Sequence, residues 1–306
     1  RVMEGFAAGI DPEFSIQEEK VGLVDPGQAA SDALDELLAA KPSITRGLLE
    51  GYGGQDLPAS LVQVYQALRA AGDDIARLPA PRAVDIEAIL AELQEAADDV
   101  LAGSAAGWNR SQQELLAQQQ TWARDLLAST AATGYLPCLS ALSSFQCNLT
   151  KLKRNNETYD ALSRLKQELI KPARMNLLAA YYANERQILH EALARLDALY
   201  RARKQAVSLL DFSDLEEFAI RLLEKRPGLR RAVQDSFDAI LMDELQDTNR
   251  LQWRLVDLLR RPDRFFAVGD INQSIYGFRH ADPEVFRAYR ATLEVRGNQI
   301  CLLYTS

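Results

Sequence analysis

Carboxylates follow two short apolar runs in the last quarter of this 306-residue chain. The run 239–242 ends in Asp243 and Glu244, and the run 265–268 is followed by Asp270. Runs of this length are typical of buried parallel strands, and the ligands of open α/β sheets bind at the carboxyl ends of such strands. Acids in this position could hold a divalent cation or a metal-bound phosphate.

The segment between the two runs has the pattern of a crossover helix. Apolar residues recur at helical spacing over 251–259, Asp247 or Thr248 could cap the helix, and Pro262 would end it. A strand, a helix and a strand of this length form a βαβ unit, whose two parallel strands end on one rim of the sheet. We therefore expect the three acids to lie beside one another.

These residue types suit phosphoryl transfer coupled to nucleic acid. One carboxylate can anchor the cation that bridges phosphate oxygens and another can orient water, and Asp243 and Glu244 supply such a pair. Tyr276, Phe278 and Arg279 have the character of a single-strand contact, because aromatic faces stack on bases and a guanidinium binds phosphate. Taken alone, the acidic pair is more often a helix cap, and the aromatic pair is more often core.

Two longer motifs resemble those of a known family. Residues 242–249 read MDELQDTN, and residues 268–279 read VGDINQSIYGFR. They resemble the second and third helicase motifs of the UvrD/Rep-type superfamily 1 DNA helicases. Asp282, Pro283 and Phe286 are most similar to the AddA/RecB-type helicase-nuclease branch. Two long motifs in this order are far more specific than an isolated acidic pair.

The resemblance implies an ATP-dependent DNA helicase that uses Mg²⁺ and takes ATP as substrate. It implies that Asp243 holds Mg²⁺, with Asp270 as a further candidate ligand, and that Glu244 polarises the attacking water. Its partners would be single-stranded and duplex DNA, with a second helicase-nuclease subunit left open and no membrane. It implies ATP sensing by Gln246, Asp247 and Gln273, with Gln273 also counted as catalytic, and DNA binding by Tyr276, Phe278 and Arg279.

Basic charge is concentrated in one part of an acidic chain. The formal net charge is −8, yet residues 150–206 carry 12 basic and 6 acidic side chains. Lys151, Lys153 and Arg154 could track a phosphate backbone or could belong to an exposed linker. Further arginines and lysines continue to Lys204, and charge alone favours a DNA-facing surface no more than a solvated helix face.

Most of the chain before the first strand has helical periodicity, and Trp108 and Trp122 are expected to pack in a core. A capping box of Ser213 and Glu216 is expected to begin a helix that runs to Leu223. Residues 210–215 resemble the DFxDL element that precedes the second helicase motif. The predicted helices are 29–40, 58–77, 86–101, 109–129, 157–170 and 172–209, with loops at 50–57, 78–82 and 133–144.

The predicted fold class is α/β, a partial P-loop NTPase (RecA-like) parallel sheet with a large all-helical insertion domain. The sequence contains no GxxxxGK followed by Ser or Thr, so we expect an internal fragment that does not hydrolyse ATP on its own. The predicted parts are the end of a first motor segment (1–28), the helical insertion (29–206), a RecA-like segment with motifs II and III (207–295), and a tail of non-native sequence (296–306).

Three irregularly spaced cysteines and two histidines argue against a disulfide framework or a zinc site. No apolar span approaches the length of a membrane helix, and no signal peptide is recognisable, so a cytoplasmic location is expected. The alternative function is a non-catalytic helical DNA-binding or regulatory module with a degenerate ATPase sheet. An ATPase that does not bind nucleic acid is disfavoured by the aromatic and arginine residues of the third motif.

Overall fold

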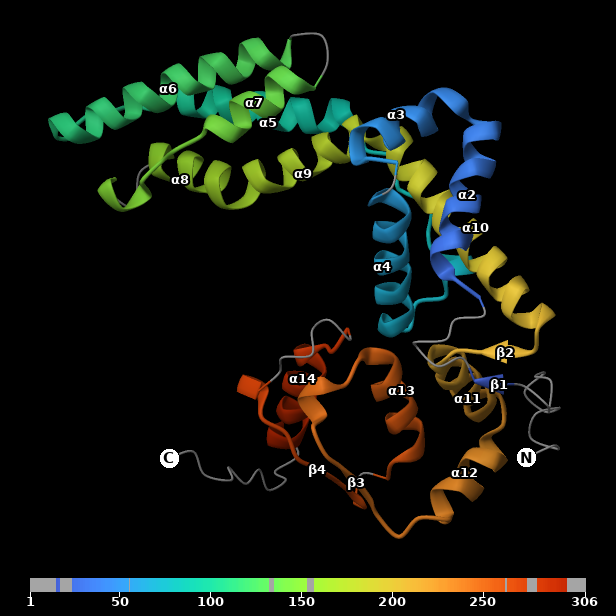
Figure 1. Cartoon of the computed structure of the whole chain (residues 1–306). Helices are drawn as coiled ribbons and strands as arrows, with labels where there is room; N and C mark the ends of the chain where they lie inside the picture. The colour runs from blue at the N-terminus through green and yellow to red at the C-terminus, as the bar shows by residue number, and fades with distance from the viewer. Residues whose placement is uncertain are drawn as a thin grey trace. The chain divides into compact units, whose positions relative to one another are not determined.

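The computed structural model describes residues 15–16, 24–54, 56–131, 135–152, 157–261, 263–273 and 280–295. It is mostly helical and contains two short parallel sheets (Figure 1). The chain divides into two compact units, one of residues 80–187 and one of residues 1–79 with 188–306. None of the described helices is long and apolar enough to cross a membrane. The α/β expectation is confirmed in this coarse form.

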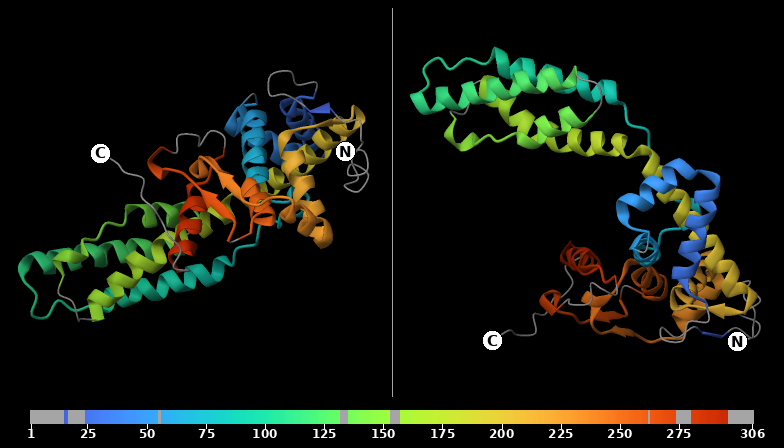
Figure 2. Two further views of the ribbon diagram at one scale, coloured as in Figure 1. Left: turned by 90° about the horizontal axis from the view of Figure 1, so that it is seen from below. Right: turned by 45° about the horizontal axis from the view of Figure 1, so that its top comes forward.

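The unit of residues 80–187 is all helical in its described part, and its helices pack along one another (Figure 2). Trp122 donates from Nε1 to the carbonyl of Ala141 (2.8 Å) and meets the ring of Phe145 edge-on at 4.6 Å. Trp108 is buried as well, so both tryptophans belong to the core as predicted. Its helices are α5 (Ile86–Ala102), α6 (Arg110–Thr130), α7 (Leu136–Ser144), α8 (Glu157–Arg164) and α9 (Ile170–Tyr181).

Two predictions for this unit are wrong, both at prolines. The predicted loop 133–144 contains helix α7, because Pro137 occupies the first helical turn, where its missing N–H costs nothing. The predicted helix boundary at Pro172 is absent, since a π turn (Leu165–Leu169) carries the helix from α8 into α9. A π turn just upstream accommodates a proline that regular α geometry would exclude.

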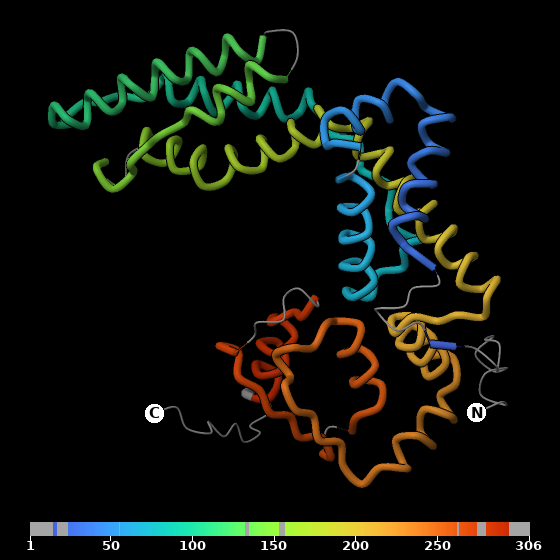
Figure 3. Tube along the Cα trace, in the orientation of Figure 1, coloured from blue at the N-terminus to red at the C-terminus, as the bar shows by residue number. Residues whose placement is uncertain are grey.

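The other unit contains a helical core and both sheets (Figure 3). Helices α2, α3, α4 and α10 enclose buried side chains that include Leu37, Tyr65 and Leu196. Its elements are β1 (Ser15–Ile16), α2 (Pro26–Ala40), α3 (Pro42–Tyr52), α4 (Asp56–Ala71), most of α10 (Ala183–Ala206), β2 (Leu209–Leu210), α11 (Phe212–Lys225), α12 (Pro227–Asp235), β3 (Ile240–Met242), α13 (Arg250–Leu259), β4 (Phe265–Ala267) and α14 (Pro283–Val295).

Several helix ends in this unit differ from the prediction. Helix α4 ends at Ala71 and not at residue 77, because Gly72 adopts a φ of +82° that other residues avoid. Helix α3 was not predicted and occupies part of the expected loop 50–57. The single helix expected over 172–209 is interrupted at Tyr182 between α9 and α10.

The predicted βαβ unit is present. Strands β3 and β4 pair in parallel, with Ile240 opposite Phe265 and Met242 opposite Ala267, and helix α13 connects them. The strands are not buried on both faces as expected, because the side chains of Leu241 and Phe266 are 76% and 59% exposed. In the part of the chain that the structure describes, this sheet has two strands and one covered face.

The caps of the two helices that flank β3 lie at residues other than those predicted. Asn249, and not Asp247 or Thr248, caps α13 by accepting from the N–H of Gln252 at 2.8 Å. Asp211, and not Ser213, caps α11 by accepting from the N–H of Asp214 at 2.8 Å. In both caps the N3 side chain accepts in return from the N–H of the cap residue, which satisfies two helix-end donors at once.

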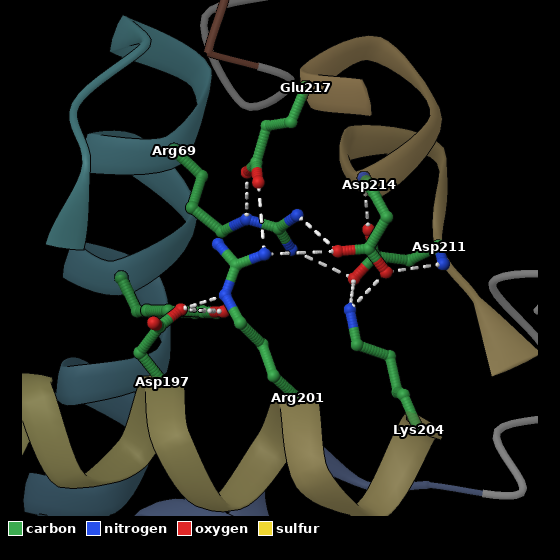
Figure 4. A network of polar contacts seen from close by, with 8 residues as sticks. Arg69, Asp197, Arg201, Lys204, Asp211, Asp214 and Glu217 are labelled. Atoms are coloured by element: carbon green, nitrogen blue, oxygen red, sulfur yellow. Dashed lines mark hydrogen bonds and ion pairs between the residues drawn. The ribbon is translucent and has the colours of Figure 1, made fainter. Parts of the chain in front are cut away.

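A network of charged side chains joins α4, α10 and the start of α11 (Figure 4). The side chains of Arg69 and Lys204 are only 4% and 3% exposed. Lys204 donates to Asp211 (2.6 Å) and to Asp214. Arg69 donates to three carboxylates of this helix start, those of Asp211 (2.8 Å), Asp214 (2.8 Å) and Glu217 (2.7 Å).

A second arginine extends the network along α10. Arg201 donates to Asp197 (2.7 Å) and Glu217 (3.0 Å), and Asp197 also accepts from the hydroxyl of Tyr65 at 2.9 Å. Burial alone would raise the pKa of Asp211, but Arg69 and Lys204 outweigh it and hold this pKa well below its ordinary value. The buried charges are therefore paired and hydrogen-bonded.

The network corrects the interpretation of the basic stretch 150–206. Arg201 and Lys204 face carboxylates within the fold, and Arg195 and Arg203 pair with Glu36 and Asp32 on α2. These four cations form neither a DNA-facing surface nor a solvated helix face. Charge counted along a sequence could not reveal this, because the partners lie in α2 and α11, before and after the basic stretch.

We predict that Asp211→Asn destabilises the chain at neutral pH by about 3–5 kcal/mol, because it leaves buried cations underpaired. The folded-state pKa of Asp211 is lowered, so its contribution is present above the unfolded value near 4 and is lost as the pH falls below that value. Urea unfolding of both proteins at several pH values should show the difference shrinking below about pH 4.

The control for this prediction is Glu224→Gln, which removes the partner of Arg254 in a pair whose side chains are 38% and 51% exposed. This change should cost less than about 1 kcal/mol at any pH. An Asp211→Asn cost no larger than that of the control, or one that does not vary with pH, would contradict the role given to the network.

Candidate active site

The candidate site lies where β3 and β4 end. The N–H of Val268 donates to the carbonyl of Met242 at 2.8 Å, and the N–H of Leu245 donates to the carbonyl of Val268 at 3.0 Å. These two bonds continue the parallel ladder past the strands. They place the residues that follow β3 beside those that follow β4, as the βαβ pattern predicts.

Glu244 has an unusual backbone at this rim. Its φ and ψ of 53° and 42° lie in the left-handed region, which costs free energy for a residue with a side chain. Its N–H donates to Oδ1 of Asp243 at 2.9 Å, and its carbonyl accepts from the N–H of Asp247 at 2.9 Å. The surrounding hydrogen bonds hold a strained conformation that turns the chain from the strand into the 3₁₀ turn Leu245–Asp247.

Gln246 joins the two strand ends. This side chain is buried at 1% exposure. Its Nε2 donates to Oε2 of Glu244 at 2.6 Å, and its Oε1 accepts from the backbone N–H of Asp270 at 2.9 Å. Gln246 was predicted to be an ATP-sensing residue, and the structure shows both ends of its amide engaged within the chain.

Gly269 permits this arrangement. A Cβ at this position would lie 2.5 Å from Oε1 of Gln246, 3.1 Å from the ring of Phe286 and 3.2 Å from the backbone nitrogen of Leu245. Any side chain would therefore displace the bridging amide. Gly269 belongs to the third motif of the sequence, but its requirement was not predicted, because the close approach of two strand ends imposes it.

Asp270 and Gln273 form a compact turn after β4. Oδ2 of Asp270 accepts from Nε2 of Gln273 at 3.0 Å, and Oδ1 accepts from the N–H of Asn272 at 3.0 Å. These donors, the Asn272 N–H first, hold the pKa of Asp270 below its ordinary value. The predicted residues Glu244, Gln246, Asp270 and Gln273 are thus connected by hydrogen bonds.

The remaining acids of the rim differ in environment. Asp243 is exposed, while Oδ1 of Asp247 is buried and lacks a hydrogen-bond partner among the described residues. No group of three or more His, Cys, Asp and Glu side chains within the described ranges is spaced to hold a metal. The three acids after the strands do not form the compact cluster expected from the sequence, because Gln246 and the turn residues occupy the space between them.

The predicted DNA-binding residues are described only in part. Tyr276, Phe278, Arg279, Lys153 and Arg154 lie outside the described residues. Lys151 is exposed at the end of a 3₁₀ turn, where its carbonyl accepts from Gln112 at 2.9 Å. It belongs to the unit of residues 80–187, whereas the rim belongs to the other unit.

The rim fits a magnesium nucleotide in the chemistry of its donors. Asp243 offers an exposed carboxylate at a strand end, and oxygen donors of this kind are those that Mg²⁺ prefers. The buried, unpartnered Oδ1 of Asp247 has capacity for a further donor. Glu244 presents a carboxylate oxygen fixed by one hydrogen bond, which could accept a proton from or orient a water molecule.

Comparison with known proteins gives the same family from two directions. The model of the UvrD/REP helicase N-terminal domain matches residues 68–294. Several proteins whose names describe one of the subunits of an ATP-dependent helicase/nuclease have similar sequences over shorter stretches. The protein from Streptococcus sanguinis strain SK36 is 44% identical over 100 residues, which is 33% of this chain and 8% of that protein.

Two further relatives of the same name agree with this similarity. The protein from Streptococcus equi subsp. zooepidemicus is 34% identical over 131 residues, 42% of this chain and 11% of its own. That from Lactococcus lactis subsp. lactis is 45% identical over 87 residues, 28% of this chain and 7% of its own. The matched stretch spans about a tenth of the relatives' length. The family match covers most of this chain, which therefore belongs to the UvrD/REP helicase N-terminal domain family.

Proposed function

We propose that this chain is part of the motor of an ATP-dependent DNA helicase that couples ATP hydrolysis to translocation along single-stranded DNA and to duplex unwinding, in DNA repair or recombination. The observation that carries the proposal is the hydrogen-bonded rim at the ends of β3 and β4, within the stretch that matches the helicase family. The names of the relatives support the same activity for the full-length protein.

Each rim residue has a proposed role. Mg²⁺ would neutralise the phosphate charge that develops during phosphoryl transfer. Asp243 would anchor it at the strand end, with Asp270 as a further candidate, and Glu244 would orient and polarise the attacking water. Gln273 and Asp247 would respond to the γ-phosphate. The chain alone is proposed to be inactive, since its sequence lacks the loop pattern that cradles phosphates.

The exposed sheet face supports a larger RecA-like domain. Parallel sheets are normally covered on both faces, and Leu241 and Phe266 leave one apolar face uncovered in the described structure. We infer that this face packs against further parts of a RecA-like motor domain in the full-length protein. The all-helical unit of residues 80–187 would then be an insertion within that motor.

DNA contact is proposed for the residues that directly follow Gln273 in sequence. Tyr276 and Phe278 would stack on bases, and Arg279 would bind phosphate or stack. The turn formed by Asp270 and Gln273 would lie between the nucleotide and this contact along the chain. Hydrolysis and DNA binding would be coupled through this short segment.

Replacing Glu244 in the full-length protein tests its role in hydrolysis. Glu244→Gln keeps the size of the side chain but removes the charge that polarises water, so ATP should still bind. DNA-stimulated turnover should fall about 10²- to 10⁴-fold, the usual contribution of a positioned acid–base group. Nucleotide affinity and steady-state hydrolysis, measured with Mg²⁺ and single-stranded DNA, distinguish the two effects. Near-normal turnover would return Glu244 to a purely structural role in the turn after β3.

Two neighbouring substitutions should fail in different ways. Asp243→Asn should weaken Mg²⁺-dependent nucleotide binding itself, because it removes the proposed anchor of the cation. Gln273→Ala should leave nucleotide binding largely intact while reducing the stimulation of hydrolysis by DNA. The same two measurements, made on both variants, check this division. Identical defects in both would contradict the separate roles.

The DNA contact is tested by binding of a fluorescent oligonucleotide at several salt concentrations. Tyr276→Ala should cost about 1–3 kcal/mol of affinity if a base stacks on it, with little dependence on base sequence. Arg279→Ala should also reduce the salt dependence. The matched control is Tyr52→Ala, which removes an exposed tyrosine of α3 and should have no effect. Unchanged affinity in both Tyr276→Ala and Arg279→Ala would contradict the assignment.

A further inference from the structure

We propose that Gln246 is a positioning residue that holds the carboxylate of Glu244 in the orientation needed to activate water. The inference rests on the proposed function, in which Glu244 acts on the attacking water. It gives Gln246 a task distinct from the nucleotide sensing implied by family resemblance, because the side chain would act through Glu244 without touching ATP.

The hydrogen bonds of Gln246 fix the direction of its amide. Its Oε1 accepts from the N–H of Asp270 at 2.9 Å, so its Nε2 must face the other way. That nitrogen donates to Oε2 of Glu244 at 2.6 Å and lies 3.5 Å from Oδ2 of Asp247. The donor held against Glu244 is therefore set by the end of the neighbouring strand.

Packing leaves the bridging amide little freedom to move. Gln246 is 1% exposed, and its Oε1 lies against the backbone at Gly269, where even a single added carbon would approach to 2.5 Å. Glu244 itself is exposed and points from a left-handed backbone. A rigid, buried donor thus restrains a flexible, exposed carboxylate, and such support is what a precise catalytic geometry requires.

The same bonds link the two helicase motifs of this chain. A continuous series runs from Glu244 through Gln246 to the N–H of Asp270, and from the carboxylate of Asp270 to Gln273. A displacement of Gln273 would reach Glu244 through three hydrogen bonds. The orientation of the proposed water-activating group would therefore depend on the position of the turn after β4.

Two substitutions in the full-length protein separate the halves of the bridge. Gln246→Met keeps the volume and removes both hydrogen bonds. Gln246→Glu keeps an oxygen acceptor for the Asp270 N–H but places a second carboxylate against Glu244. The control is Gln234→Met, which removes a similar bond, from Nε2 to the Leu258 carbonyl at 2.8 Å, on α12. Thermal unfolding of each variant establishes whether it folds.

Both variants should lower kcat for DNA-stimulated ATP hydrolysis by about 10- to 100-fold, with KM for ATP changed by less than about threefold. Gln234→Met should leave both constants unchanged. The decisive comparison is the double variant Glu244→Gln with Gln246→Met. It should be no slower than Glu244→Gln alone, because a residue that acts only through Glu244 has nothing left to position.

Three results would overturn the proposal. These are an unchanged kcat in both Gln246 variants, a rise in KM without a fall in kcat, and a double variant whose defect is the product of the two single defects. If Gln246→Met does not fold, Gln246→Glu decides the first two, and its combination with Glu244→Gln decides the third. Normal turnover in Glu244→Gln would instead contradict the proposed function, so the two failures remain distinguishable.

Discussion

The parallel pairing of β3 with β4 is the constraint on which the rest of the candidate site depends. The register fixed by Met242 and Ala267 brings two strand ends to the same level. The chain then has to turn sharply after β3, and Glu244 accepts a left-handed backbone to make that turn. Gln246 can reach the N–H of Asp270 only because both conditions hold, and the absence of a side chain at Gly269 leaves room for it.

The helices that surround this strand pair are held by charge as much as by apolar contact. Helix α13, which connects the strands, packs against α11 and α4. Arg69 and Lys204 bind the start of α11 to α4 and α10, and Gln252 on α13 donates to Glu216 on α11 at 3.1 Å. Well-packed apolar side chains can stabilise a fold as well as a buried ion pair can, but removal of one partner from such a pair is costly. The network therefore gives the junction one strongly preferred arrangement.

The sequence predicted the parts of the fold that depend on local pattern. The two apolar runs gave strands β3 and β4, and the periodicity between them gave helix α13. Local pattern failed where a residue has two uses. Pro137 begins α7 although proline usually ends a helix, and Asp211 caps α11 although Ser213 is an equally good cap. The second oxygen of Asp211 binds Arg69 and Lys204, distant partners that no local rule contains.

The candidate site was predictable in its members and not in its connections. Glu244, Asp270 and Gln273 were identified from residue type and from resemblance to a helicase motif. The role of Gln246 required coordinates, because its bonds cross from one strand end to the next over 24 residues. The basic stretch failed in the opposite sense, since Arg201 and Lys204 suggested DNA and instead neutralise carboxylates.

The most direct test of this account is an experimental structure of the full-length protein with Mg²⁺, a non-hydrolysable ATP analogue and single-stranded DNA. The account predicts the metal beside Asp243, a water between Glu244 and the γ-phosphate, and the Gln246 amide still bonded to Glu244 and to the N–H of Asp270. A nucleotide bound away from the ends of β3 and β4, or a Gln246 amide turned toward the phosphates, would contradict it.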